Sequence, residues 1–415
     1  MLKPFPRLQP SYYEAFRCVG SVCEDTCCVG WRVPVDKLTY EKYQACEHPT
    51  LGPKLHALVN IVPAAQSDES FAEIKLDLGT CPFLAEGWCQ VQATLGEELL
   101  SKSCATYPRV MATVDGVLER SLDLSCPEAA RLALTNPLPM EFVERLGEED
   151  DARLGSLGIV DTTNSKHPDK PFRHVHEVRS LMISLLQNRG YPLSQRMLVL
   201  GRLCDKLETE GTEQGCGALL EMAQEPAPIL PRASMPSTGR FETVVELVLA
   251  RIGSDATTRR FLDCYQAFMA GMHWTGESTM DQLAASLDAA FAGPFQAFRS
   301  QHEYMLEHYL VAYVFRSLFP FGSESVNRKL AEHQFEHSIT RQYQLMVVDF
   351  VVIEALLAGL AAFYGDAFGV PAALKLIQSA TKTFEHSLSY PGKALDLLNK
   401  KGMLDCASMS MLIRD

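Results

Sequence analysis

The sequence predicts a mainly α-helical protein in which a small, irregular α+β, cysteine-rich module precedes an all-helical domain. Three observations predict this fold. Nine of the 13 cysteines lie before residue 130, strand and hairpin signals occur only in the first third, and helical periodicity dominates the rest. A length of 415 residues allows two or three domains. We therefore expect a module at 1–135, a linker at 136–170 and a helical domain at 171–415.

Two segments of the N-terminal third predict strands. Apolar and polar residues alternate in "FAEIKLDL", residues 71–78, which is typical of a half-buried strand. The stretch "RVMATVDGVLERSLDL", residues 109–124, predicts a hairpin in which Asp115 and Gly116 form a type I′ turn. These strands give the cysteine-rich module its expected β component.

The segment "SCPEAARLAL" predicts the first clear helix. We expect Ser125 to be its N-cap, with Pro127 in the first turn and Glu128 completing a capping box. Cys126 would then lie at a helix N-terminus, where the helix dipole lowers the pKa of a thiol.

The remainder of the chain shows two breaks and several apolar helices. Residues 136–170 are polar and turn-rich, and residues 224–239 contain four prolines. The apolar stripe at 178–186 has the i, i+3, i+4 spacing of an amphipathic helix. The most apolar segment, residues 345–365, contains Asp349 and Glu354. Because carboxylates are costly in lipid, we interpret this segment as a core helix, not a membrane span.

Composition excludes some partners. The formal net charge of −13 argues against nucleic acid and against an anionic membrane surface, both of which select basic proteins. The start, "MLKPFPRLQPSYYEAF", has no apolar signal-peptide core, so we predict a cytoplasmic protein. Cysteines in a reducing compartment are metal ligands more often than disulfides.

The strongest functional signal is a set of eight cysteines in four segments, beginning with C-x4-C-x3-C-C. Thiolates are soft anionic donors that bind zinc and iron–sulfur clusters. Eight thiols exceed the needs of one site, so one site with spare thiols and two sites both remain open. We expect a [4Fe–4S] cluster held by four of the eight, with zinc as the alternative. The predicted metal ligands are Cys18, Cys23, Cys27, Cys28, Cys81, Cys89, Cys104 and Cys126.

These segments carry a resemblance to a known family. "FRCVGSVCEDTCCVGW", "CPFL…WC", "CATYPR" and "SLDLSCPEAA" resemble blocks of the bacterial flagellin lysine-N-methylase family, and also a wider group of metal-chelating cysteine-cluster proteins. Two helical blocks, "LLQNRGYPLSQRMLVLG" and "YLVAYVFRSLFPF", resemble the methylase family alone. The resemblance implies methyl transfer from S-adenosylmethionine to flagellin lysines, with a cysteine-bound [4Fe–4S] cluster taking part.

The residues themselves do not place the methyl donor. The chain has no strand, Gly-rich turn and helix of the Rossmann type, and "GTEQGCG" at 211–217 is read as a loop. The cysteines also lack a C-x3-C-x2-C triplet. A lysine amine must lose its proton before it attacks a methyl group. Tyr107 is the predicted contributor to that step, and Arg109 is predicted to contact the carboxylate of the donor.

Two alternative functions remain. The same cysteines suit a metal-binding or electron-transfer protein without methylase activity. The stretch "HQFEH", with His333, Glu336 and His337, matches the H-x-x-E-H pattern of a zinc hydrolase. A five-residue pattern has low specificity, so a polar helix face is the preferred interpretation of it.

Overall fold

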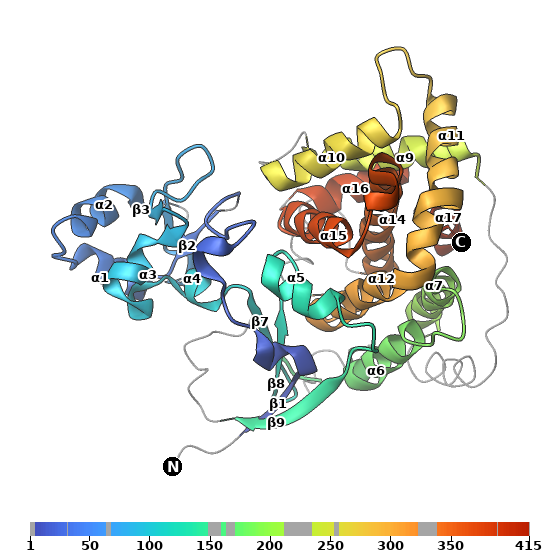
Figure 1. Cartoon of the computed structure of the whole chain (residues 1–415). Helices are drawn as coiled ribbons and strands as arrows, with labels where there is room; N and C mark the ends of the chain where they lie inside the picture. The colour runs from blue at the N-terminus through green and yellow to red at the C-terminus, as the bar shows by residue number, and fades with distance from the viewer. Residues whose placement is uncertain are drawn as a thin grey trace.

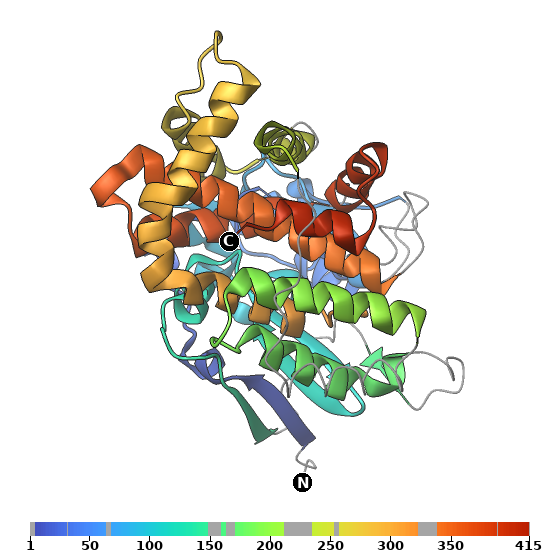
Figure 2. The ribbon, with the colours of Figure 1, turned by 90° about the vertical axis from the view of Figure 1, so that its right-hand side faces the viewer.

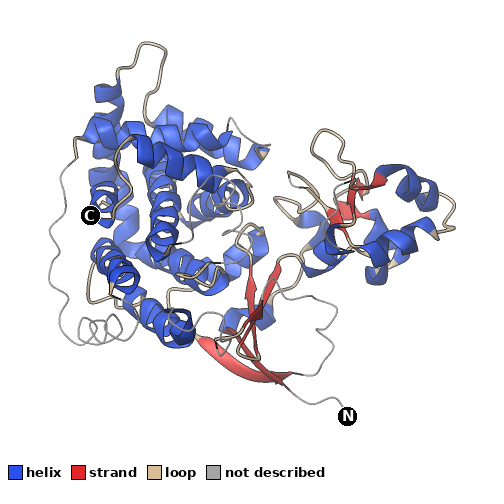
Figure 3. Cartoon of the chain, turned by 180° about the vertical axis from the view of Figure 1, so that it is seen from behind, coloured by secondary structure: helices blue, strands red, loops and turns tan. Residues whose placement is uncertain are grey.

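A five-stranded mixed sheet lies beside a large helical domain, and the cysteine-rich module projects from the other side of the sheet (Figures 1 and 3). This arrangement comes from a computed structural model. It describes residues 5–30, 32–63, 68–147, 159–162, 171–210, 235–252, 257–322, 338–387 and 389–414. All described strands lie before residue 161, so the mixed N-terminal part and the helical C-terminal part are confirmed.

The mixed sheet has the strand order β10-β7-β8-β1-β9. The β7–β8 hairpin is confirmed, with Asp115 and Gly116 both at positive φ (49° and 78°), as a type I′ turn requires. Strand β1 pairs in parallel with β8 and antiparallel with β9, while β10 runs parallel to β7. The strands are β1 Phe5–Pro10, β7 Arg109–Val114, β8 Val117–Leu122, β9 Phe142–Gly147 and β10 Ile159–Val160.

The cysteine-rich module contains a second small sheet, a two-stranded ladder and four short helices around their own apolar core. Strand β4 ends at Ile74, so the strand predicted at 71–78 is shorter than expected. The chain turns tightly after it, since Asp77 pairs with Thr80 across Leu78 at φ 47°. The elements are β2 Pro34–Val35, α1 Lys37–Gln44, α2 Leu51–Leu58, β3 Val59–Ile61, β4 Ala72–Ile74, β5 Leu84–Ala85, β6 Trp88–Cys89, α3 Gln90–Leu95 and α4 Lys102–Thr106.

The helical domain surrounds one long central helix, and Figure 2 shows it from the side with β1 at its lower edge. Its helices follow one another through short turns or through segments outside the described residues. They are α6 Val175–Leu186, α7 Leu193–Thr209, α9 Ser237–Ile252, α10 Arg259–Gly271, α11 Met280–Ala290, α12 Gln296–Arg316, α14 Ile339–Tyr364, α15 Val370–Phe384, α16 Tyr390–Lys400 and α17 Cys406–Leu412. The predicted break at 224–239 lies mostly outside the described residues.

Helix α14 is the central helix. The side chain of Ser338 caps its start, and Gly365 at φ 53° follows its end. Among the described residues, only this segment (339–367) is long and apolar enough to cross a membrane, and 94% of its most apolar window is buried inside the protein. That burial supports the core-helix interpretation.

Helices α10 and α14 approach closely where two glycines meet. A Cβ on Gly271 would lie 2.1 Å from the Gly359 carbonyl oxygen, and a Cβ on Gly359 would lie 2.3 Å from the Phe268 ring. Any side chain at either position would push the two helices apart. This contact brings α10 and α14 into close packing and stabilises the centre of the domain.

The large core extends beyond the helical domain into the mixed sheet. Ala112, Val114, Leu124 and Ala130 belong to the same buried apolar cluster as the long helices. Two parts of the predicted 136–170 linker, β9 and β10, are strands of this sheet. Packing therefore divides the chain differently from the predicted module boundary at 135, because the hairpin and the helix after it share the C-terminal core.

The helix after the hairpin, α5 (Pro127–Leu134), starts one residue later than predicted. Its N-cap is Cys126, which makes no side-chain capping bond, so the predicted Ser125 cap and capping box are wrong. The Ser125 hydroxyl instead hydrogen-bonds to Tyr107 and His386. A tertiary contact has therefore replaced the local cap.

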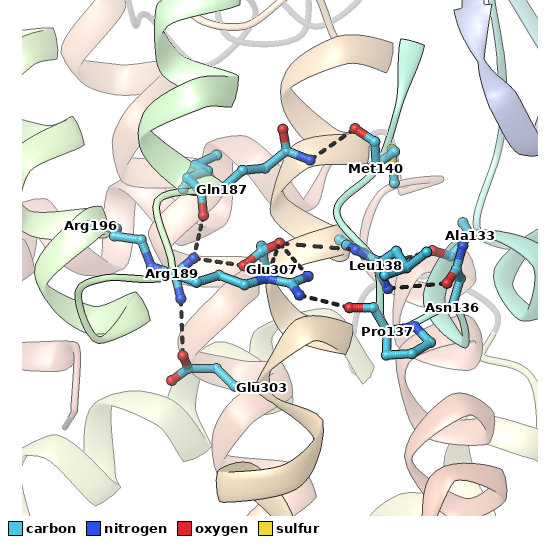
Figure 4. Close-up of polar contacts among 12 residues, drawn as sticks. Ala133, Asn136, Pro137, Leu138, Met140, Gln187, Arg189, Arg196, Glu303 and Glu307 are labelled. Atoms are coloured by element: carbon cyan, nitrogen blue, oxygen red, sulfur yellow. Dashed lines mark hydrogen bonds and ion pairs between the residues drawn. The ribbon is translucent and has the colours of Figure 1, made fainter. Parts of the chain in front are cut away.

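A buried ion cluster joins α7 and α12 (Figure 4). Glu307 of α12 is 1% exposed and accepts hydrogen bonds from Arg189 at 2.8–3.1 Å and from Arg196 at 2.7 Å. Arg189 also donates to the Pro137 carbonyl, and Gln187 donates to that of Met140. The cluster thus connects two helices with the segment that follows α5.

The buried carboxyl of Glu354 predicts a pH-dependent stability. Burial raises its pKa from 4.5 to about 7, and the neighbouring Arg299, at 3.3 Å, offsets this only in part. Between those two pH values the folded state holds a proton that the unfolded state has lost. The free energy of unfolding should therefore fall as pH rises through this window, by up to about 3 kcal/mol.

Urea unfolding of wild type and Glu354→Gln at pH 5 and pH 8 measures the pH-dependent contribution of Glu354 to the free energy of unfolding. We expect the variant to lose less stability than wild type between the two values. The exposed Glu97→Gln is the matched control and should keep the wild-type loss. Equal losses in Glu354→Gln and wild type would contradict the assignment.

Candidate functional site

Main-chain pairing brings the first two cysteine segments together. Residues 27–30 run antiparallel to residues 79–81, with Val29 bridged to Thr80. The Cys81 amide donates to the Cys28 carbonyl at 2.8 Å. The cysteine doublet therefore lies against the "CPFL" segment, as the resemblance to cysteine-cluster proteins implies.

A close glycine contact holds the loop with the first two cysteines. Gly20 lies between them at φ 60°, and a Cβ there would lie 2.5 Å from the Trp88 ring. Trp88 immediately precedes Cys89 in β6. The loop that carries Cys18 and Cys23 is thereby fixed against the segment that carries Cys89.

The first thiol group centres on Cys28. Cys27 and Cys81 donate hydrogen bonds to its sulfur, which lowers the pKa of Cys28 and raises the pKa of both donors. Burial raises the pKa of Cys104 to about 11, and the charges of Cys89 and Cys28 add to the effect. Burial likewise raises the pKa of Cys89, with Cys28 contributing. Cys28 thus interacts with four other predicted ligands, Cys27, Cys81, Cys89 and Cys104.

The second thiol group consists of Cys18, Cys23 and Cys126. Burial raises the pKa of Cys126 to about 12, and the charges of Cys23 and Cys18 raise it further. The amides at the start of α5 lower this pKa, as expected at a helix N-terminus, but desolvation outweighs them and the net shift is upward. Cys27 lies between the two thiol groups, since the charge of Cys18, a member of the second group, raises the pKa of Cys27.

The clustered thiols have the chemistry of a metal site. Every cysteine in the described parts of the chain is a free thiol. Cys18 and Cys27 are exposed, Cys81 and Cys126 are buried, and the other four predicted ligands are half-buried. The sulfurs of Cys27 and Cys81 hydrogen-bond to that of Cys28. Within the described ranges no three Cys, His, Asp or Glu side chains converge in a metal-binding geometry.

Helix α15 anchors the cysteine loop to the helical domain. Lys382 forms an ion pair with Asp25 at 2.8 Å, and both side chains are less than a tenth exposed. Lys382 also donates to the Thr26 carbonyl at 3.0 Å, and Gln378 donates to Asp25 at 2.8 Å. These contacts fix the chain on the N-terminal side of Cys27 and Cys28.

A polar network lies beside Cys126, where α4, α5, α12 and α15 meet. The Ser125 hydroxyl is 2.9 Å from the Tyr107 hydroxyl and 3.0 Å from His386 Nε2. The same Nε2 is 3.5 Å from a carboxylate oxygen of Asp123, which also pairs with Arg316. Burial opposes the charge of Asp123, yet Arg316 and His386 hold its pKa well below the usual range.

The two predicted catalytic residues lie at different edges of this network. Tyr107 is a member of it, and burial raises its pKa well above the usual value. Arg109 lies in β7 with its guanidinium 5.3 Å from the centre of the Phe16 ring. Both roles stay predictions. His333, Glu336 and His337, and the 211–217 loop, lie outside the described residues.

Sequence reasoning missed the helical-domain residues of the site. His386, Lys382 and Gln378 lie more than 250 residues after Ser125, and helix periodicity gives no hint of these contacts. The one signal was "FEHS" at 384–387, a short echo of the "HQFEH" stretch. It was too short to single out His386.

The Lys382–Asp25 pair gives a prediction about the anchoring of the cysteine loop. Lys382→Met should leave a buried carboxylate without its cation, at a cost of about 2 kcal/mol. This is below the 3–5 kcal/mol typical of a broken buried pair because Gln378 still donates to Asp25. Hydrogen exchange of residues 20–30 should speed up. Lys401→Ala, which removes a more exposed pair with Glu246, is the control and should leave this exchange unchanged. Equal exchange in Lys382→Met and wild type would contradict the anchoring role.

Comparison with known proteins shows the family to which the chain belongs. The profile of the FliB lysine N-methylase C-terminal domain matches residues 179–412, which is more than half of the chain. The chain belongs to the FliB lysine N-methylase family. The matched region contains Lys382 of α15 and His386, which follows α15. The eight clustered cysteines lie before the matched region.

Individual relatives agree with the FliB family assignment. The chain is 37% identical over 147 residues to the flagellar biosynthetic protein FliU of Salmonella muenchen, covering 35% of this chain and 86% of FliU. It is 36% identical over 147 residues to the lysine-N-methylase of Salmonella typhimurium, and 35% identical to that of Salmonella choleraesuis. Each of these matches covers 35% of this chain and 36% of the methylase. No solved structure matches the chain significantly.

Proposed function

We propose that this protein is a protein-lysine N-methyltransferase that acts on flagellin in the cytoplasm, with S-adenosylmethionine as the methyl donor. The FliB family match over residues 179–412 carries the proposal. The names of the relatives, lysine-N-methylase and flagellar biosynthetic protein, support the reaction and the flagellar substrate. Lysine methylation uses S-adenosylmethionine as its usual donor, so the family also supports that cofactor.

The first thiol group is the proposed metal site, holding a [4Fe–4S] cluster, with zinc as the alternative. Cys28, Cys81, Cys89 and Cys104 are the proposed ligands. The charge of Cys28 acts on Cys81, Cys89 and Cys104, as it does on Cys27, and of these five thiols Cys27 is the one that is exposed. Cys27 is then the donor to the Cys28 sulfur, and the second thiol group is assigned no metal. A bound cluster supplies electron transfer or a Lewis-acid iron, whereas zinc supplies structural stability.

The open edge of the site suits a protein substrate. Cys18 and Cys27 are exposed, and the His386 side chain next to the second thiol group is 25% exposed. A lysine side chain on a folded partner can reach groups at such an edge without unfolding either protein. The net charge of −13 is compatible with a cationic lysine approaching this surface.

The test uses protein purified without oxygen, purified flagellin and S-adenosylmethionine that carries a deuterated methyl group. We expect mass spectrometry to find the labelled methyl group on flagellin lysines. Absence of label, together with unchanged lysine methylation in flagellin from a strain that lacks this protein, would refute the proposal. A metal-bearing protein that neither binds the donor nor labels flagellin would favour the electron-transfer alternative.

The metal assignment has its own measurement. Anaerobically purified protein with broad visible absorbance and stoichiometric iron and sulfide would support the cluster. Colourless protein with one zinc per chain would support a structural zinc site. These readings do not depend on methyl transfer, so each part of the proposal is tested separately.

A further inference from the structure

Three side chains from distant segments form one hydrogen-bonded chain. Tyr107 lies at the end of α4, Ser125 precedes α5, and His386 lies just after α15. The Tyr107 and Ser125 hydroxyls are 2.9 Å apart, and the Ser125 hydroxyl is 3.0 Å from His386 Nε2. Both distances are short enough for a hydroxyl proton to pass between neighbours.

The two ends of this chain face different surroundings. The Tyr107 end lies beside the thiol segments, since its hydroxyl bonds to Ser125, which directly precedes Cys126, and Tyr107 follows Cys104 by three residues. Ser125, in the middle, is fully buried. The His386 end is 25% exposed and can release a proton to solvent. The chain therefore leads from the thiol edge through the interior to the surface.

We propose that Tyr107, Ser125 and His386 form a proton relay that deprotonates the substrate lysine, an inference that rests on the proposed methyl transfer. The substrate N–H bond breaks as an O–H bond forms on Tyr107. Tyr107 gives its own proton to Ser125, and Ser125 gives its proton to His386 Nε2. The products are a neutral amine with a free electron pair and an imidazolium, so protons and charge balance.

The groups around His386 favour the charged product. Asp123, on the segment before α5, is 3.5 Å from Nε2 and would stabilise the imidazolium. Arg316, at the end of α12, opposes that effect, but it is paired with both Asp123 and Glu385. Lys382, one turn earlier on α15, is paired with Asp25. Asp123 is thus the carboxylate in ion-pair distance of the imidazole.

Histidine is the side chain suited to accept this proton, because its ordinary pKa of about 6.5 lies near physiological pH. Two other described histidines have different surroundings. His308 is buried against the Ala133 carbonyl, and His56 is exposed on α2. His386 combines contact with the segment next to Cys126 and access to solvent.

The kinetic test compares wild type, His386→Gln and Tyr107→Phe between pH 7 and pH 9.5. At pH 7.5 each variant should methylate flagellin about a hundredfold more slowly, the usual loss when general-base help is removed. Variant rates should then rise about tenfold per pH unit, because solution must supply the neutral lysine, whose ordinary pKa is about 10.4. The wild-type rate should level off.

Two further variants separate a relay from a loss of structure. The double variant Tyr107→Phe/His386→Gln should be no slower than either single variant, since each single change already interrupts the same chain. Added imidazole should partly restore His386→Gln. The exposed His56→Gln is the control and should keep the wild-type pH profile. Wild-type rates in His386→Gln would overturn the relay.

A second measurement does not need activity. In protein with ¹⁵N-labelled histidine, the His386 signal is identified by its loss in His386→Gln. We expect Nε2 without a proton and Nδ1 with one at neutral pH, and a shift of the signal in Ser125→Ala. A proton on Nε2 would overturn the relay even if the enzyme is inactive. An inactive wild type with the expected tautomer would instead count against the proposed methyl transfer.

Discussion

Replacing Cys28 by alanine is expected to remove almost all of the proposed metal. Cys28 is the centre of the first thiol group, and its sulfur accepts hydrogen bonds from Cys27 and Cys81. A cluster or a zinc ion that loses one of four thiolates loses a bond that no neighbouring main-chain group replaces. Metal per chain, measured after anaerobic purification, should fall to near zero, and methyl transfer to flagellin should fall with it.

Two matched variants are the controls for Cys28→Ala. Cys46→Ala changes a half-buried cysteine of the same module and should retain the full metal content. Cys126→Ala removes a thiol of the second group and should also retain it. Full metal content in Cys28→Ala would contradict the assignment of the ligands to the first group. Loss in Cys126→Ala would show that the ligands come from both groups.

Replacing Glu307 by alanine is expected to destabilise the protein by about 3–5 kcal/mol, the usual cost of breaking a buried ion pair by removing one partner. Arg196, which is 2% exposed, would then keep only its bond to the half-buried Glu303 and one to a main-chain carbonyl. Arg189 would lose all three of its hydrogen bonds to the carboxylate (Figure 4). Urea unfolding at constant pH measures the change.

Glu303→Ala is the control for Glu307→Ala, since it removes a carboxylate from the same arginine. The Glu303 side chain is 33% exposed, so its loss should cost about 1 kcal/mol or less. Equal losses of unfolding free energy in the two variants would show that the burial of Glu307 does not determine the size of the loss. An unchanged urea slope in both variants would confirm that the unfolding reaction remains the same.

Local sequence patterns correctly predicted those turns and helices that depend only on neighbouring residues. The Asp115-Gly116 turn is confirmed because both residues take positive φ. The 345–365 segment is confirmed as a core helix because its apolar residues extend around all faces of the helix. The Ser125 cap was wrong, since a tertiary hydrogen bond from His386 competed with the local one. The strand at 71–78 was too long because the turn at Leu78 ends it early.

The sequence by itself determined the class of fold, the family and the clustering of the thiols along the chain. Closely spaced thiols are soft donors in any conformation, and their spacing along the chain is visible without a structure. Only the tertiary structure decided which thiols lie together. It also brought His386 and Lys382 to segments more than 250 residues away. The reason is physical: such contacts depend on the packing of α15 against the cysteine loop and α5, and no local propensity encodes them.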